Sequence, residues 1–447
     1  MSITTSTKET LEAAVVKRQR LTLTAMCLAL GMAALDDTVV NVALPSVQAN
    51  LSMSVSGLQW ILNAYLLPIA CLVLPAGNLG DVYGRRKVFL FGLASFVIAS
   101  MLVGIAINGP MAIAGRLLQG VGSAALLPCS LSILSDAYPD PKERTKAIGI
   151  WSGVSGLALI LDPALGGILV DTLSWRSIFY LNLPLGLLTF WLTGRAVPSV
   201  TTTREYRRHL PSRSTVSCQI DLPGMVLSVI ALASFVMLMM GYEGFSVRSL
   251  LLLGLSIGSA ATFVLVEFVS ARPMLPMALF CQRTFAAAFV TNALLLFMLV
   301  SLLFIFSLFL QQVQGYSAIE AGLRFLPLNA AFILSSVLSG YCSAFMGSRW
   351  SITAGFVTAG VAVLSLVSVQ VDTPYTALLV RLIFVGFGSG FTLSPLTAAG
   401  MSSTSSKFSG IAAALMNTST RLGGALGIAV QGSVFTHQMG ANLQASL

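Results

Sequence analysis

The chain has 447 residues, of which 56% are hydrophobic and only 9% are charged. Soluble proteins carry about 25% charged residues, so this composition excludes a soluble globular protein and indicates an integral membrane protein. The formal net charge is +9, but the basic residues are scattered over short loops. We therefore attribute this charge to membrane topology and expect no nucleic-acid partner.

Apolar segments long enough to cross a bilayer as helices, about 20 residues each, recur along the whole chain. The first is predicted to be a retained span and not a signal peptide, because it lacks a small-residue cleavage site and carries two carboxylates. The predicted fold class is thus an all-α integral membrane bundle. We predict thirteen helices, at 21–43, 57–77, 87–107, 110–134, 146–169, 176–196, 222–241, 249–269, 285–310, 321–346, 350–370, 375–399 and 409–435.

The longest polar stretch, residues 197–221, divides these helices into groups. After a cytoplasmic N-terminal tail, residues 1–20, the first six helices form an N-terminal half, residues 21–196. The polar stretch is then a cytoplasmic linker. Two inserted central helices follow at residues 222–269, and residues 270–447 form a C-terminal half with five helices.

The Lys and Arg residues set the predicted orientation, because cytoplasmic loops of membrane proteins are rich in them. With the N-terminus in the cytoplasm, 19 of the 25 basic residues lie on the cytoplasmic side, 2 lie outside and 4 lie within spans. We therefore predict a cytoplasmic N-terminus and an external C-terminus.

Two loops share a weak pattern that indicates an internal repeat. "GNLGDVYGRRK", residues 77–87, and "GYCSAFMGSRW", residues 340–350, both carry two glycines seven residues apart, and an arginine two residues after the second glycine. Parallel repeats are one transporter architecture. Asp81 of the first copy corresponds to Ala344 in the second. We therefore expect any gate formed by these loops to be asymmetric.

The first of these loops resembles the loop that marks the major facilitator superfamily. Its glycines permit a tight turn, its acid can pair with an arginine or a helix N-terminus, and its basic residues can anchor it to anionic lipid. The resemblance implies a loop that controls conformational exchange. Its residues are Gly77, Asp81, Gly84, Arg85, Arg86 and Lys87.

Other motifs extend the resemblance from about residue 20 to about residue 435. "RLLQGVGSAALLP" resembles the fourth-span motif of the superfamily, and "LDDTVVNVALP" resembles the first-span motif of its fourteen-span drug:proton antiporter branch. "WRSIFYLNLPLG", "QGYSAIEAGLRFLP" and "NTSTRLGGALG" also look like that branch. The resemblance implies a two-half bundle in the cytoplasmic membrane, contacting lipid, that works as a monomer and exports small amphipathic drugs or antibiotics in exchange for protons.

Two carboxylates lie in the first predicted span, where the chain is otherwise suited to lipid. With a helical rise of about 1.5 Å per residue, Asp36 lies about 22 Å from the inner end of its span, and Arg116 lies about 9 Å from the outer end of the fourth. Both therefore lie in the outer half of the membrane. Burial favours a protonated carboxyl and a nearby arginine favours a charged one, so we predict that this pair couples transport to protons.

Asp37 is rotated by about 100° from Asp36 around the helix. We predict that it lines the substrate cavity or contacts a neighbouring helix, with Asn41, Gln119 and Arg421 as further candidates for the cavity lining. The alternative is that both carboxylates merely face a wet outer vestibule. We expect Asp36→Asn to stop proton-driven export and to leave folding intact, because a neutral amide costs less in lipid than a carboxylate.

The fifth span carries "ALILDPALGG", residues 158–167, which departs from the antiporter-type motif of the branch. Pro163, Gly166 and Gly167 remain, but Ala158 and Asp162 occupy two glycine positions. Asp162 lies about 25 Å from the inner end of its span. We predict a second proton-coupling site there; cation binding and a damaging substitution are the alternatives.

Nothing in the sequence indicates an enzyme, a metal site or a cofactor. The proton gradient is the expected driving force. The six cysteines are dispersed and the two histidines lie far apart. The antiporter branch has fourteen spans, whereas we predict thirteen. The second half is therefore expected to lack its last helix. The alternatives to drug export are therefore transport of one specific metabolite by the same fold, and a truncated copy that does not transport.

Overall fold

The computed structural model describes residues 2–198, 221–240, 246–270, 277–371, 373–403 and 409–445, and these ranges contain helices and no strands. Most of the predicted linker, residues 199–220, lies outside the described residues. Each of the thirteen predicted segments has a helix in the structure, so the predicted all-α fold class is confirmed.

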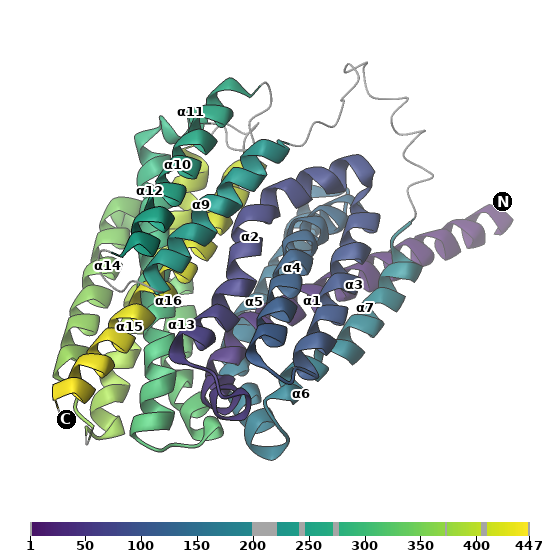
Figure 1. The fold of residues 1–447 in the computed structure, drawn as a ribbon. Helices are drawn as coiled ribbons and strands as arrows, with labels where there is room; N and C mark the ends of the chain where they lie inside the picture. The colour runs from purple at the N-terminus through teal and green to yellow at the C-terminus, as the bar shows by residue number, and fades with distance from the viewer. Residues whose placement is uncertain are drawn as a thin grey trace.

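Seven helices form the N-terminal half, which is drawn in purple and blue in Figure 1. They are α1 (Ser2–Leu51), α2 (Val55–Tyr83), α3 (Arg85–Gly104), α4 (Gly109–Ala137), α5 (Pro141–Thr172), α6 (Arg176–Tyr180) and α7 (Asn182–Ala196). The first helix includes most of the predicted N-terminal tail. The sixth predicted span is divided at Leu181 into the short α6 and α7.

The remaining helices follow the linker. They are α9 (Leu222–Met240), α10 (Val247–Val269), α11 (Met277–Phe280), α12 (Arg283–Leu308) with a π-helical turn η2 (Phe309–Val313), α13 (Ala318–Met346), α14 (Ser348–Ser365) with a 3-10 turn η3 (Leu366–Ser368), α15 (Tyr375–Ser402) and α16 (Ser409–Ala445). Helices α12 to α16 form the C-terminal half, which lies beside the N-terminal half in Figure 1.

Local sequence signals explain where several helices begin. Asn108 accepts a hydrogen bond from the N–H of Met111, and Asp140 accepts one from the N–H of Glu143, so each caps the helix that follows it. Ser317 and Glu320 form a reciprocal capping box at the start of α13. These caps fix the helix boundaries that hydropathy leaves uncertain.

Both loops of the predicted repeat turn at a glycine. Gly84 joins α2 to α3 with φ 101°, and Gly347 joins α13 to α14 with φ 80°. Side chains rarely adopt these values, so a glycine is needed at each turn. The second glycine of each copy of the pattern therefore has the same structural role.

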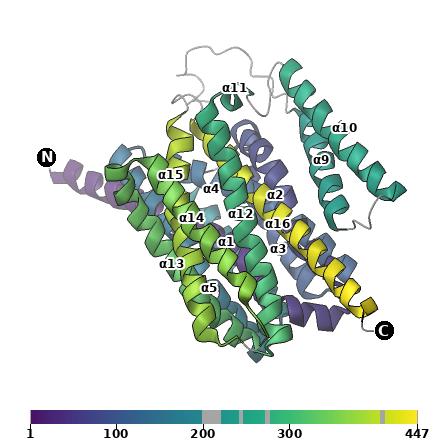
Figure 2. The same cartoon turned by 90° about the vertical axis from the view of Figure 1, so that its left-hand side faces the viewer.

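Helices α9 and α10 form a hairpin beside the two halves (Figure 2). Val236 of α9 packs with Ala429 of α16 and with Trp60 and Leu67 of α2. Helix α10 packs on α9 and exposes large apolar side chains, among them Leu251 and Val269. An exposed apolar face of this kind suits a lipid solvent, and ten of the helices in the described ranges are long and apolar enough to span a membrane.

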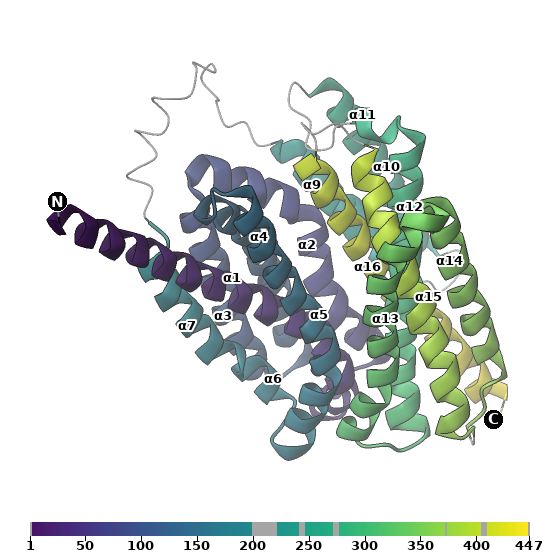
Figure 3. The same cartoon turned by 180° about the vertical axis from the view of Figure 1, so that it is seen from behind.

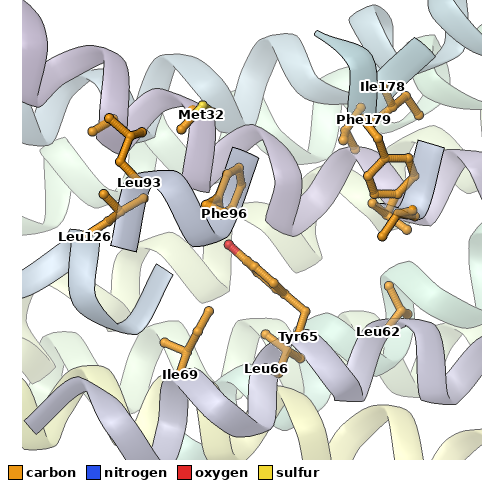
Figure 4. Packing of buried hydrophobic residues seen from close by; sticks show 14 of the residues in the cluster. Met32, Leu62, Tyr65, Leu66, Ile69, Leu93, Phe96, Leu126, Ile178 and Phe179 are labelled. Carbon is orange, nitrogen blue, oxygen red and sulfur yellow. The ribbon is translucent and has the colours of Figure 1, made fainter. Parts of the chain in front are cut away.

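The largest core lies mainly in the N-terminal half and extends to Phe304 of α12 and Ile428 of α16. Tyr65 of α2 lies there among apolar side chains that include Phe96, Leu126 and Phe179 (Figure 4). Tyr65 is 1% exposed. Its hydroxyl group lies 3.0 Å from the carbonyl oxygen of Ala33 and 2.9 Å from the Ser123 hydroxyl. This core holds α1, α2 and α4 in fixed positions around the polar cluster described next.

Candidate functional site

A buried ion pair joins α1 to α4 inside the N-terminal half. The Arg116 guanidinium donates to the Asp36 carboxylate, and the two residues are 0% and 1% exposed. Two amide side chains also donate to this carboxylate: Gln119 at 3.1 Å and Asn182, at the start of α7, at 3.3 Å. Asp36 therefore has a full set of donors in this conformation.

The other partners of Arg116 fix its orientation. Its Nε donates to the carbonyl oxygen of Ile61 at 3.1 Å, and a terminal nitrogen donates to the Gln119 side-chain oxygen at 3.1 Å. Its guanidinium carbon lies 4.2 Å from the centre of the Tyr65 ring, a distance suited to a cation–π interaction. The structure thus brings Asp36 and Arg116 together, as predicted from their similar depths in the membrane.

Some members of this cluster were not predicted. Asn182 and Ser100 hydrogen-bond to each other at 3.2 Å, and Ser100 also accepts from Gln119 at 2.7 Å. The available signal for Asn182 was an amide side chain within an apolar span. Gln119, predicted to line the substrate cavity, is 0% exposed and lies within this cluster.

A second ion pair joins the two halves. Arg421 of α16 donates to the Asp37 carboxylate of α1. The side chains of Arg421 and Asp37 are 18% and 22% exposed, in contrast to the buried Asp36 and Arg116. The adjacent carboxylates therefore serve different contacts: Asp36 holds α1 to its own half, and Asp37 holds it to the opposite half.

Helix α5 also contacts the C-terminal half at the end of the bundle opposite the linker (Figure 3). A Cβ atom added to Gly167 would lie 2.4 Å from Cα of Ile319, and one added to Gly322 would lie 1.9 Å from the carbonyl oxygen of Pro163. The backbones of α5 and α13 therefore touch. The Asp171 carboxylate extends this contact, because it accepts from the N–H of Ile319 at 2.8 Å.

Helix α1 contributes to the same closure through its backbone. The Ser307 hydroxyl donates to the carbonyl oxygen of Asn41 at 2.5 Å, and Gln311, in the π-helical turn, donates to that of Val42 at 3.0 Å. On the other side of the bundle, Gln59 of α2 donates to the carbonyl oxygen of Ile428 at 2.9 Å. The two halves are thus joined at the end opposite the linker.

The antiporter-type motif lies at this junction. Gly166 faces α1, where an added Cβ atom would lie 2.5 Å from a methyl group of Val39, while Gly167 faces α13. Asp162, one turn earlier, is 0% exposed and accepts a hydrogen bond from the Thr38 hydroxyl. The structure therefore places the three proton-coupling candidates in two separate clusters, Asp36 with Arg116 and Asp162 with Thr38.

The predicted gating loop lies at the linker end of the bundle. Arg85 forms an ion pair of 2.7 Å with Asp136 at the end of α4, and Arg86 donates to the carbonyl oxygen of Gly194 in α7 at 3.2 Å. Lys87 is exposed, and the side chain of Asp81 lies outside the described residues. Gly77 lies against Pro128 of α4. The loop thus connects helices of the N-terminal half.

Within the part of the chain that the structure describes, no group of three or more His, Cys, Asp or Glu side chains is placed so that it could hold a metal ion.

Comparisons with known proteins agree with the motifs. Residues 26–428 match the family model described as Major Facilitator Superfamily. The chain is 34% identical over 436 residues to "Multidrug resistance protein Stp" of Mycobacterium tuberculosis (strain ATCC 25618 / H37Rv), covering 96% of this chain and 78% of the relative. It is also 34% identical over 413 residues to "Methylenomycin A resistance protein" of Bacillus subtilis (strain 168), covering 91% and 86%.

Among solved structures, the chain resembles a bacterial homologue of the human lysosomal transporter Spinster. The TM-score is 0.68 with 19% identity, and the match covers 96% of this chain and 85% of the other. At this identity the likeness concerns the fold.

Proposed function

The chain belongs to the major facilitator superfamily, and from this premise we propose that it exports small amphipathic drugs or antibiotics across the cytoplasmic membrane in exchange for protons. It is a multi-pass membrane transporter and not an enzyme. The printed names of its relatives, which concern multidrug and methylenomycin A resistance, support a substrate class of toxic small molecules. Both ion pairs are complete within one chain, which supports function as a monomer.

The observation that carries proton coupling is the buried pair of Asp36 and Arg116. A carboxylate buried in a membrane protein marks a functional site by default, because its burial is costly. A proton on Asp36 would remove its charge and weaken its attraction to Arg116. Release of Asp36 would free α1 to move relative to α4.

The position of Asp36 on α1 connects such a movement to the opposite half. Asp37 is the next residue and pairs with Arg421, and the carbonyl oxygen of Asn41, about one turn further on, accepts from Ser307. A change at Asp36 therefore acts on the helix that holds the two halves together. Protonation shifts the balance between two conformations only if the proton affinity of Asp36 differs between them. The ion pair with Arg116 supplies that difference, because it forms only with the charged carboxylate.

The function is tested with the purified protein in lipid vesicles that contain a fluorescent amphipathic cation. We expect an imposed pH gradient to drive transport of the dye against its concentration gradient, and an uncoupler to stop it. Transport that continues unchanged with the uncoupler would refute proton antiport. Transport of a single metabolite, with no effect on any toxic compound of a panel, would refute the substrate class.

The proposed orientation places the linker in the cytoplasm and the closed end of the bundle, where α5 meets α13, on the outside. We expect an alkaline phosphatase domain, which is active only outside the cytoplasm, to be active when fused after Gly315 and inactive when fused after residue 210. These sites follow different numbers of spans, and the basic loops favour the cytoplasm for the linker. The opposite pattern of activity would reverse the proposed direction of transport.

A further inference from the structure

The two ion pairs of α1 differ in how fully their polar atoms are used. In the pair of Asp36 and Arg116, every guanidinium nitrogen donates a hydrogen bond and both carboxylate oxygens accept one. In the pair of Asp37 and Arg421, the described part of the chain provides a single hydrogen bond, between one nitrogen and one oxygen. The second pair therefore keeps further donors and an acceptor for another partner.

The second pair is also the more accessible one. The side chains of Arg421 and Asp37 are 18% and 22% exposed, whereas those of the first pair are 1% and 0% exposed. Helix α1 runs from the linker end of the bundle to the closed end (Figure 1). Asp37 precedes Asn41 and Val42, whose carbonyl oxygens accept hydrogen bonds from the C-terminal half. The pair therefore lies on the linker side of these contacts, which close the junction.

A transport cycle has to break this pair, because its two members belong to different halves. Separation of the halves leaves a carboxylate on α1 and a guanidinium on α16, facing each other across the interface. Substrate sites of transporters built from two halves lie at this interface. A charged group within a membrane protein is paired or faces water. A substrate that displaces water from between these two groups therefore has to replace both lost contacts.

We propose that Asp37 and Arg421 form a substrate subsite for zwitterions, small molecules that carry one cationic and one anionic group. The cation of the substrate binds Asp37 and its anion binds Arg421, whose planar guanidinium suits paired hydrogen bonds with a carboxylate. A purely cationic substrate would satisfy Asp37 and leave Arg421 without a counter-ion, and a purely anionic one would do the reverse. The subsite rests on the proposed function, whose substrate class it narrows.

The test compares two dyes that differ in one charge. Rhodamine B carries a cationic xanthene and a carboxylate, and its ethyl ester keeps the cation but lacks the carboxylate. Fluorescence anisotropy measures binding of each dye to the full-length protein in lipid nanodiscs, at one pH and after subtraction of binding to empty nanodiscs. We expect the parent to bind rhodamine B about tenfold more tightly than the ester, because the ester loses a charge-assisted hydrogen bond.

Arg421→Gln should abolish this preference, since it removes the group that binds the dye carboxylate and frees Asp37 for the cation that both dyes carry. The control is Arg195→Gln, the same substitution at an exposed position of α7, which should keep the parental preference. Asp37→Asn combined with Arg421→Gln leaves neither charge of the pair and should also show no preference. This double variant decides the matter if Arg421→Gln alone does not fold.

The ratio of the two affinities separates direct contact from a role in joining the halves. A change in the balance between conformations alters the affinity for both dyes by the same factor and leaves their ratio unchanged. A parental ratio in both Arg421→Gln and the double variant would therefore overturn the proposal. Equal affinities of the parent for the two dyes, or no saturable binding of rhodamine B, would also overturn it.

The outcome is independent of proton coupling, because the binding assay contains no pH gradient. A failure of proton-driven export would leave a measured preference for the zwitterion standing. Equal affinities for the two dyes would leave export of amphipathic cations standing.

Discussion

Asp36→Asn is expected to abolish export driven by a pH gradient and also to destabilise the protein, whereas Asp36→Asn combined with Arg116→Gln should recover stability without export. The single change leaves the buried Arg116 without its counter-ion. Breaking a buried ion pair by removing one partner costs about 3–5 kcal/mol. The double change replaces both charges with neutral amides, so no buried charge remains, but no group is left to take up the proton.

The measurements are thermal unfolding in detergent and dye transport in vesicles with an imposed pH gradient. Asp37→Asn is the matched comparison, since it removes the neighbouring carboxylate from a partly exposed pair. It should destabilise the protein less than Asp36→Asn does, because its pair is less buried, and it should retain part of the transport. Transport at the parental rate by either variant that lacks Asp36 would exclude this residue as the coupling acid.

This expectation differs from the one that the sequence alone gives. A neutral amide costs less in lipid than a carboxylate, so the sequence predicts that Asp36→Asn folds normally. That argument treats Asp36 by itself. The structure shows that the carboxylate compensates the charge of Arg116, and the free energy of the substitution is therefore dominated by the arginine that remains.

Hydropathy predicted the order of the helices because each span must satisfy its own backbone within the bilayer. The depths of Asp36 and Arg116 also followed from sequence, since helical rise is constant. Contacts between helices did not follow, because tilt and rotation depend on packing against neighbours. The pairing of Asp37 with Arg421, 384 residues away, and the capping of α13 by Asp171 depend on that packing.

Two further features escaped prediction for local reasons. The sixth span is interrupted at Leu181, and this interruption brings Asn182 into hydrogen-bonding distance of Asp36. A window of average hydropathy cannot detect a single such break. The substitution at Asp162 was visible in the motif, but its hydrogen-bond partner, the Thr38 hydroxyl, belongs to another helix.

Gly167→Val is expected to abolish transport by preventing closure of the junction between α5 and α13. A Cβ atom at this position would lie 2.4 Å from Cα and 2.8 Å from the backbone nitrogen of Ile319. Overpacking costs about 1–3 kcal/mol where side chains can adjust, and backbone atoms adjust less readily. The halves would have to separate at this end, and export requires both the open and the closed conformation.

Gly153→Val is the matched control, because it makes the same substitution in the same helix at a position where an added Cβ atom meets nothing within 4 Å. Any effect of valine on the helix itself is therefore common to both variants. We expect Gly153→Val to transport at nearly the parental rate, while Gly167→Val transports no more than empty vesicles and reaches the membrane in equal amount.

The direction of the effect can be measured with a single cysteine introduced at Leu303, which lines a small cavity at the junction, after replacement of the native cysteines. In the proposed orientation this end faces outward. Gly167→Val should therefore speed labelling of that cysteine in intact cells by a thiol reagent that does not cross the membrane, whereas Gly153→Val should not. Equal labelling in both variants, or transport by Gly167→Val at the parental rate, would show that contact between these two backbones is not needed for the transport cycle.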